Sequence, residues 1–231
     1  TKLIISIAVL IVLGSFTLIA SRHKLATMQK DYQSERQEQE AIASFFNTTD
    51  NAKAVYVYDA TNKKVLYERN AETPLPLASV TKLATALTVN STFTPDQTIT
   101  ISDKALAVEG DNGLLAGEVW KRDPLLGFML VISSNDAASA FKEAIPNFMD
   151  TMNAYAKQIG LEHTTFYNPS GLDTGGKPGA IGTAKDMSTL ILHFLDTMPE
   201  IAAQTTLPQN SYTARTAQDR EKVHTISNTN D

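Results

Sequence analysis

The chain opens with an unbroken apolar run and then turns polar. Residues 3–20 read LIISIAVLIVLGSFTLIA, with no charged side chain among them. A helix of this length is roughly 27 Å long, which is close to the hydrocarbon thickness of a bilayer. Leu18 and Ala20 do not form the small-X-small pattern of a signal-peptide cleavage site, so an uncleaved anchor is favoured over a cleaved signal. We therefore expect residues 1–22 to be a transmembrane anchor or a signal segment.

Residues 23–46 are predicted to form a solvated helical stalk. They contain no Gly or Pro, and their centre, QKDYQSERQEQE, is rich in good helix formers. Leu25, Met28 and Tyr32 are sparse apolar positions that would allow a weak oligomer seam, but a plain spacer is the favoured interpretation. A folded domain of residues 47–231 is expected to follow the stalk.

From residue 47 the hydrophobic pattern becomes that of a folded domain. β-rich runs at 54–58 and 64–67 flank a polar turn and predict a hairpin. Residues 80–89 place Leu and Ala at helical spacing, so a helix that buries one face is expected there. Further helices are expected at residues 123–132, with Asp123 as N-cap, and at 137–144, 147–159 and 183–197. Strands that open the domain and helices that fill its middle indicate an α+β fold.

Composition excludes several classes of function. A formal net charge of -5 and a sequence pI near 5.4 argue against a general nucleic-acid binder, because phosphate neutralisation needs clustered Lys and Arg. The absence of cysteine excludes a disulfide framework and a thiolate nucleophile. The four histidines do not have the spacing of a metal-binding motif. We therefore expect no metal and no organic cofactor.

Ser79 and Lys82 are a candidate catalytic pair at a predicted junction between a loop and a helix. A serine hydroxyl is a poor nucleophile at neutral pH, and a lysine one helical turn later can lie over it and remove its proton. The spacing alone is weak evidence, because residues 21–24 and 139–142 share it. Those two pairs lie beside the apolar run and inside a predicted helix, where no preceding loop exposes the serine.

Ser133 and Asn135 form a second candidate group, at the end of a predicted buried helix. The hydroxyl of Ser133 can relay a proton, and the side-chain amide of Asn135 can hold a peptide substrate. A Ser-X-Asn sequence is common by itself. Its occurrence after Ser-X-X-Lys, in this order and with these flanking residues, is much less common.

With these flanks the chain resembles the low-molecular-mass penicillin-binding proteins, which are the D-alanyl-D-alanine carboxypeptidases of serine peptidase family S11. The similarity rests on AVYVYDATNKKVLYERNAETPLPLASVTKLATAL around the first motif and on ALAVEGDNGLLAGEVWKRDPLLGFMLVISSNDAA around the second. TTFYNPSGLDTGG and IGTAKDMSTLILHFL resemble the family's Asn-X-X-Gly-Leu loop and the helix after it. The resemblance runs from about residue 54 to residue 230. It implies a β-lactamase-like fold, with an antiparallel sheet beside a cluster of helices.

The resemblance also implies a role for each candidate residue. Ser79 would attack the carbonyl between two D-alanines of a peptidoglycan stem peptide, with Lys82 as its base. Ser133 would help with proton transfer, and Asn135 would bind the substrate. An acyl-enzyme would form on Ser79 and be hydrolysed by water, and β-lactams would be covalent inhibitors. The backbone N–H of Ser79 would be one arm of the oxyanion hole.

Such a function implies that the domain lies outside the cytoplasmic membrane, where the cell wall is, and takes part in cell-wall remodelling and cell shape. We expect a single N-terminal anchor to hold it at the cell membrane. The basic residues that follow the apolar run, Arg22, His23 and Lys24, taken alone favour a cytoplasmic location for that flank. The two signals disagree, and a bias in flanking charge is the weaker of them.

One family motif is missing from the sequence. Lys-Thr-Gly, which the family carries on an edge strand, does not occur. Lys177-Pro178-Gly179 resembles it weakly but lies in the wrong segment and lacks the hydroxyl group. In the family a stretch that resembles residues 225–230 precedes this motif. We therefore expect a chain truncated before Lys-Thr-Gly, with an incomplete sheet and little turnover as it stands.

Other functions fit the residues less well. A class A β-lactamase shares both motifs, but its Glu-X-X-Leu-Asn loop is absent, since Glu162 is followed by His163 and Thr164. An α/β-hydrolase is disfavoured because no Gly-X-Ser-X-Gly occurs. The second hypothesis is a catalytically inactive, membrane-tethered domain that binds or scaffolds peptidoglycan. Acylation of Ser79 by penicillin would distinguish it from an enzyme.

Overall fold

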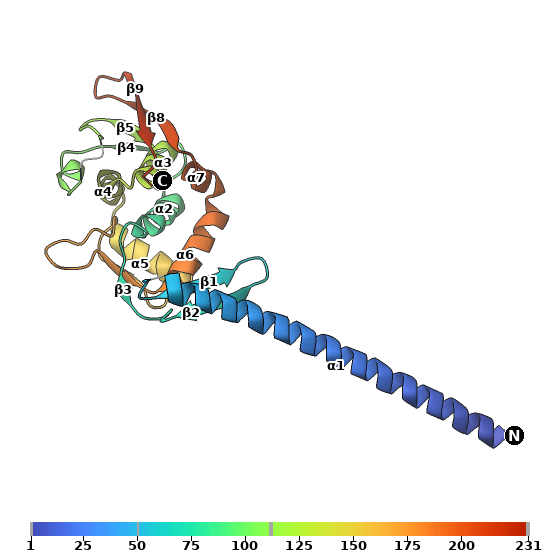
Figure 1. Cartoon of the computed structure of the whole chain (residues 1–231). Coiled ribbons are helices and arrows are strands. Elements are labelled where there is room, and N and C mark those ends of the chain that lie inside the picture. Colours follow the sequence, from blue (N-terminus) through green and yellow to red (C-terminus); the bar gives the residue numbers. More distant parts are fainter. Residues whose placement is uncertain (1, 50, 111–112, 230–231) are drawn as a thin grey trace. The chain divides into compact units, whose positions relative to one another are not determined.

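The structure is a computed structural model that describes the backbone of residues 2–49, 51–110 and 113–229. Side chains are described for 21–44, 51–110 and 113–229. The chain divides into two compact units (Figure 1). The first comprises residues 1–53 and 57–67, and the second comprises residues 54–56 and 68–231.

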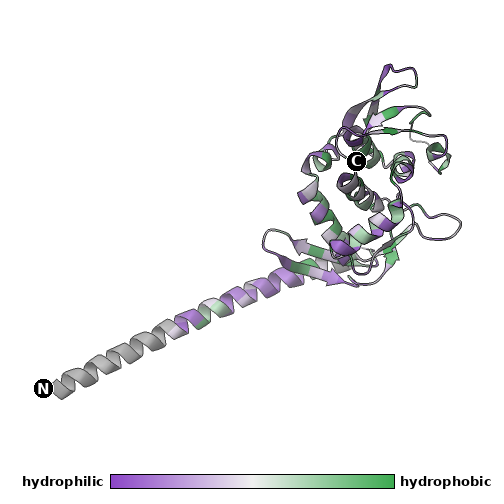
Figure 2. Ribbon diagram, turned by 180° about the vertical axis from the view of Figure 1, so that it is seen from behind, coloured by the Kyte–Doolittle hydropathy of each residue, from purple (hydrophilic) through white to green (hydrophobic). Residues whose placement is uncertain are grey.

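The first unit is dominated by one long helix, α1 (Lys2–Thr49), which runs without a break through the predicted anchor and stalk. Figure 2 colours most of its described part as hydrophilic. The sparse apolar side chains of the predicted stalk, at positions 25, 28 and 32, are 59%, 60% and 62% exposed. An exposed Arg36–Glu40 ion pair, 2.9 Å between Nε and Oε1, adds a small stabilisation along the helix.

None of the helices, as far as their side chains are described, is long and apolar enough to cross a bilayer. The predicted membrane segment, residues 3–20, lies outside the part of the chain with described side chains, and only its helical backbone is given. The membrane anchor stays a prediction.

The predicted hairpin is present. Strands β1 (Val55–Asp59) and β2 (Lys64–Arg69) form a two-stranded sheet. The carboxylate of Asp59 closes the turn between them, because its Oδ1 accepts hydrogen bonds from the backbone N–H of Thr61 at 2.9 Å and of Asn62 at 3.0 Å. Asp and Asn favour such turns for this reason.

The second unit is built around helix α2 (Thr81–Thr92), which is buried over most of its first two turns. Four other helices pack against it (Figure 1): α3 (Arg122–Val131), α4 (Asn135–Ala144), α5 (Phe148–Gln158) and α6 (Ala184–Thr197). The short helices are η1 (Ala105–Ala107) and α7 (Pro199–Gln204). The largest apolar side chains of the core are at most 2% exposed; they are Trp120, Phe128, Phe141, Phe166 and Leu87. This packing makes α2 a rigid base for Ser79, which lies two residues before the helix.

Two helix starts differ from the expectation. Asp123 is not the N-cap of α3, because Lys121 occupies that position and the helix begins at Arg122. The buried Arg122 side chain donates to the carbonyl of Phe93 at 2.5 Å and to Asp123 at 2.7 Å, which anchors the earlier start. Helix α4 begins at residue 135 because the Ser134 hydroxyl accepts from the N–H of residue 137 at 3.1 Å.

Strands that the sequence pattern did not predict complete the unit. They form a three-stranded sheet in the order β3-β7-β6 and a four-stranded sheet in the order β4-β5-β8-β9, both antiparallel. The first contains β3 (Leu75–Pro76), β7 (Ala180–Gly182) and β6 (Thr165–Phe166). The second contains β4 (Thr98–Thr100), β5 (Val119–Lys121), β8 (Gln209–Arg215) and β9 (Glu221–Ser227). Helices against antiparallel sheets confirm the predicted α+β class.

A buried carboxylate joins the four-stranded sheet together. Glu118 accepts from Lys222 at 2.8 Å, from Trp120 Nε1 at 3.1 Å, and lies 3.1 Å from His224 Nε2. Burial alone would raise the pKa of Glu118, but the hydrogen bonds from Lys222 and Trp120 outweigh it and hold the pKa below its ordinary value. Burial lowers the pKa of His224, and the nearby Glu118 carboxylate opposes that effect.

Candidate active site

Ser79 lies in the turn that leads into α2, and its side chain is exposed. The turn is tightly wound, because the N–H of Thr81 donates to the carbonyl of Ala78 at 3.1 Å and the N–H of Lys82 donates to the carbonyl of Ser79 at 2.9 Å. The serine is therefore accessible to a substrate while its backbone is fixed by the helix behind it.

The amine of Lys82 is close to three oxygen atoms. Its Nζ is 3.0 Å from Ser79 Oγ, 3.2 Å from Ser133 Oγ and 3.3 Å from the carbonyl oxygen of Ser170. The side chain is 1% exposed, although lysine is almost never fully buried in proteins. The amine is thus withdrawn from water and directed at two hydroxyl groups.

Burial lowers the pKa of Lys82 from its ordinary 10.5 to about 8. Desolvation penalises the charged ammonium and leaves the neutral amine unaffected, so burial favours loss of the proton. A lysine with this pKa is partly neutral near pH 7 and is suited to accept a proton.

Ser133 reaches the site from the loop between α3 and α4, 51 residues from Lys82. Its backbone has a φ of 58°, in the left-handed region that non-glycine residues rarely adopt. This conformation reverses the chain between the two helices and turns the Ser133 hydroxyl toward Lys82. Strained residues of this kind cluster at functional sites.

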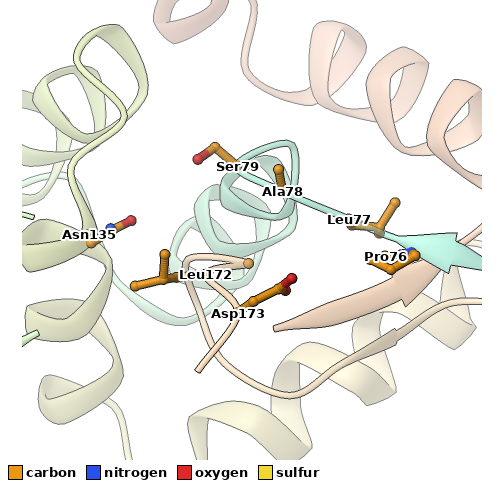
Figure 3. A pocket seen from close by; sticks show the side chains of 8 residues that line it. Pro76, Leu77, Ala78, Ser79, Asn135, Leu172 and Asp173 are labelled. Carbon is orange, nitrogen blue, oxygen red and sulfur yellow. The ribbon is translucent and has the colours of Figure 1, made fainter. Parts of the chain in front are cut away.

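Asn135, the first residue of α4, lines the same pocket as Ser79 (Figure 3). Its Nδ2 donates to the carbonyl oxygen of Glu109 at 2.9 Å. An amide nitrogen carries two hydrogens. One is engaged by Glu109, which orients the Asn135 amide beside the pocket.

The loop at residues 168–172 packs against α2 beside the site, and its contacts were not predicted from the sequence. The Asn168 side chain accepts from the N–H of Gly171 at 2.8 Å and donates to the carbonyl of Leu172 at 2.8 Å. The Thr85 hydroxyl donates to the carbonyl of Pro169 at 2.6 Å. These bonds hold the loop against α2 and direct the next carbonyl at Lys82.

Gly171 is required by the close approach of this loop to the nucleophile. Its φ is +76°, and a Cβ there would lie 2.2 Å from the carbonyl oxygen of Ala78, the residue before Ser79. The Asn-X-X-Gly-Leu pattern was the available signal for this loop in the sequence. It carried no indication that a carbonyl of the loop would face Lys82.

Two pockets flank Ser79. One, of about 320 Å³, lies on the side of Asn135 and Leu172, and the other, of about 330 Å³, lies on the side of Lys82 and Ser133. Figure 3 shows Ser79 at the start of α2, Asn135 on the neighbouring helix, and Leu172 on the loop between them. An extended substrate therefore has space on both sides of the hydroxyl.

The arrangement supports attack by a serine on an acyl group. Ser79 is the exposed hydroxyl, Lys82 the nearby amine with a lowered pKa, and Ser133 a second hydroxyl within reach of the same amine. The other Ser-X-X-Lys pairs lie inside α1 and α4, as expected. Nowhere in the described residues do three His, Asp or Glu side chains gather as a metal site would require.

Comparisons with known proteins point to one family. A family model described as D-alanyl-D-alanine carboxypeptidase, peptidase S11, matches residues 37–230. The chain is 32% identical to the D-alanyl-D-alanine carboxypeptidase DacC of Escherichia coli over 167 residues, which cover 65% of this chain and 41% of that protein. It is 31% identical to a D-alanyl-D-alanine endopeptidase of Pseudomonas aeruginosa over 144 residues, covering 59% of this chain and 45% of that protein.

A solved structure agrees with these matches. The ampicillin-bound penicillin-binding protein D2 of Listeria monocytogenes is 31% identical, with a TM-score of 0.57, covering 78% of this chain and 73% of that one. The matched region spans less than half the length of these two curated relatives, 41% and 45%. The match nevertheless covers most of this sequence and includes both motifs. The chain therefore belongs to peptidase family S11, the D-alanyl-D-alanine carboxypeptidase family.

Proposed function

We propose that this protein is a serine-type D-alanyl-D-alanine carboxypeptidase that acts on peptidoglycan stem peptides through an acyl-enzyme on Ser79. The observation that carries the proposal is the position of the Lys82 amine, 3.0 Å from Ser79 Oγ and 3.2 Å from Ser133 Oγ. A merely structural lysine would not need to be buried between two hydroxyl groups, where it loses hydration.

These positions support the following reaction. The neutral amine of Lys82 takes the proton of Ser79 as Oγ attacks the carbonyl carbon of the penultimate D-alanine. The tetrahedral intermediate collapses, the peptide C–N bond breaks, and the leaving D-alanine amine receives a proton through Lys82 and Ser133. Water then attacks the ester, with Lys82 again accepting a proton, and Ser79 is regenerated. Asn135 holds the acyl part of the peptide.

Covalent trapping tests the nucleophile. We expect fluorescent penicillin to label the full-length gene product, and mass spectrometry of the digest to place the adduct on the peptide that contains Ser79. The Ser79→Ala variant is the control and should stay unlabelled while keeping its thermal unfolding temperature. If the folded protein takes up no penicillin during long exposure, the enzyme hypothesis is wrong and a binding or scaffold role becomes the better account.

Substrate assays test the reaction. We expect release of D-alanine from a short peptide ending in D-Ala-D-Ala. One relative is named as a carboxypeptidase and another as an endopeptidase, so cross-linked muropeptides should be assayed in parallel. Faster cleavage of the cross-linked material would assign endopeptidase activity to the same Ser79 site.

We also propose that the domain lies outside the cytoplasmic membrane, anchored by the apolar segment at residues 3–20. The support is the composition of that segment and the location of a peptidoglycan substrate. Protease treatment of intact spheroplasts should degrade the domain. Full protection, with degradation only after lysis, would place it in the cytoplasm.

A further inference from the structure

The pocket beside Asn135 has an unusual distribution of charge. Most of its wall is apolar, from Pro76, Leu77 and Leu172, and among the residues that the structure describes Asp173 is the only ionisable side chain that lines it. Figure 3 shows Asp173 directly after Leu172 on the loop that faces Ser79. A ligand that enters this pocket therefore meets apolar surface and a single carboxylate.

The Asp173 carboxylate is held in place and keeps its charge uncompensated. Its Oδ1 accepts from the N–H of Gly179 at 3.0 Å. The intervening turn is closed by paired hydrogen bonds between Thr174 and Lys177, both 3.0 Å long. Within the described residues no cationic side chain forms an ion pair with Asp173. One carboxylate oxygen is thus oriented by the backbone, and the charge remains available to a ligand.

The two pockets beside Ser79 suit opposite ends of the substrate. A peptide that ends in D-alanine carries a terminal carboxylate, which the negative charge of Asp173 would repel. The pocket lined by Lys82, Ser133 and Thr205 has no acidic side chain among its described lining residues. The leaving D-alanine therefore fits the Lys82 side, and the residue that precedes the two D-alanines fits the Asp173 side.

We propose that Asp173 is a specificity-determining residue that binds a free primary amine on the side chain of the residue preceding the two D-alanines. The inference rests on the proposed function, because it assumes that Ser79 is acylated by such a peptide. An alkyl ammonium chain matches the pocket, since its methylene groups contact the apolar wall and its charge meets the carboxylate. The enzyme would then favour stem peptides whose side-chain amine is neither cross-linked nor acylated.

Two peptides that differ only in this amine test the proposal. We would compare D-alanine release from Nα-acetyl-L-Lys-D-Ala-D-Ala and from its Nα,Nε-diacetyl form, using the full-length gene product. We expect kcat/KM to be about tenfold higher for the free amine, which corresponds to about 1.4 kcal/mol. The ratio should fall as ionic strength rises, because salt screens an exposed charge pair.

The Asp173→Asn variant separates charge from structure. Its amide oxygen still accepts from the N–H of Gly179, so the loop keeps its hydrogen bond. We expect the preference ratio of this variant to fall to about one, by the same tenfold loss. Asp196→Asn, which removes an exposed carboxylate from α6, is the matched control and should leave the ratio unchanged.

The outcomes distinguish a failure of this inference from a failure of the proposed function. Equal cleavage of both peptides by the wild type, or an equal loss for both in Asp173→Asn, would overturn the role of Asp173 and leave the proposed function standing. Release of D-alanine from neither peptide would overturn the proposed function and the inference together. If Asp173→Asn fails to fold, as shown by loss of penicillin labelling, the wild-type ratio and its salt dependence still decide the question.

Discussion

The burial of Lys82 makes a quantitative prediction about pH. With a pKa of about 8, about one Lys82 side chain in ten is neutral at pH 7, against about one in 3,000 at the ordinary pKa of 10.5. Burial thus increases the concentration of the active base about 300-fold at neutral pH. Acylation needs the neutral amine, so its rate should follow this fraction.

The assay is the second-order rate constant for acylation by a fluorescent penicillin between pH 6 and pH 10. We expect the rate to rise about tenfold per pH unit below 8 and to level off above it. Replacing Leu130, which lines the same pocket as Lys82, by Asn should admit water and move the inflection toward 10.5. A rate that is flat from pH 6 to 8, or that still climbs at pH 10, would refute the assignment of Lys82 as the base.

The lowered pKa of Lys82 also affects the stability of the fold. Its effect is opposite to that of a stabilising ion pair, which would raise the pKa of a lysine. The folded-state pKa of Lys82 is lower than the unfolded one, so between pH 8 and 10.5 the unfolded chain binds more protons than the folded one. The free energy of unfolding should therefore rise with pH across this window. At neutral pH the burial costs about 3 kcal/mol, so Lys82→Met should abolish acylation without lowering the unfolding temperature.

Three further perturbations test the surroundings of the site. Ser133→Gly should raise the free energy of unfolding by about 1 kcal/mol in urea titrations, because glycine adopts the positive φ without strain. The same variant should slow acylation, measured by penicillin labelling, as much as Ser133→Ala does. Gly171→Ala should destabilise the fold by about 2 kcal/mol more than Gly176→Ala, since the two residues have nearly the same φ, +76° and +75°, but only at Gly171 would a Cβ meet other atoms. Equal thermal shifts for the two variants would contradict this. Stability should fall as the pH drops below 6.5, because the unfolded state protonates His224 before the folded state does and Glu118 loses its hydrogen bonds further down. His224→Gln should weaken this dependence in urea titrations at a series of pH values, and an unchanged pH profile would count against it.

Long elements were predictable because their patterns repeat. Helix α6 was expected from residue 183 and begins at residue 184, with the Thr183 hydroxyl accepting from the N–H of Asp186 at 3.1 Å. The strands of two or three residues had no comparable signal, since so short a run shows no period. They form only because distant partners supply their hydrogen bonds, as when Pro76 pairs with Ile181.

The sequence by itself determined the local part of the candidate site. A spacing of three residues on a helix places Lys82 one turn after Ser79, because that geometry is a property of the α-helix. The Ser-X-Asn pattern after a predicted buried helix indicated Ser133 and Asn135, and the family resemblance implied their roles, but neither showed how they lie. Only the tertiary structure decided that Lys82 is buried and that the carbonyl of Ser170, 88 residues away, is its third neighbour. Desolvation depends on which segments pack around a group, and those segments come from parts of the chain whose contacts no local pattern specifies.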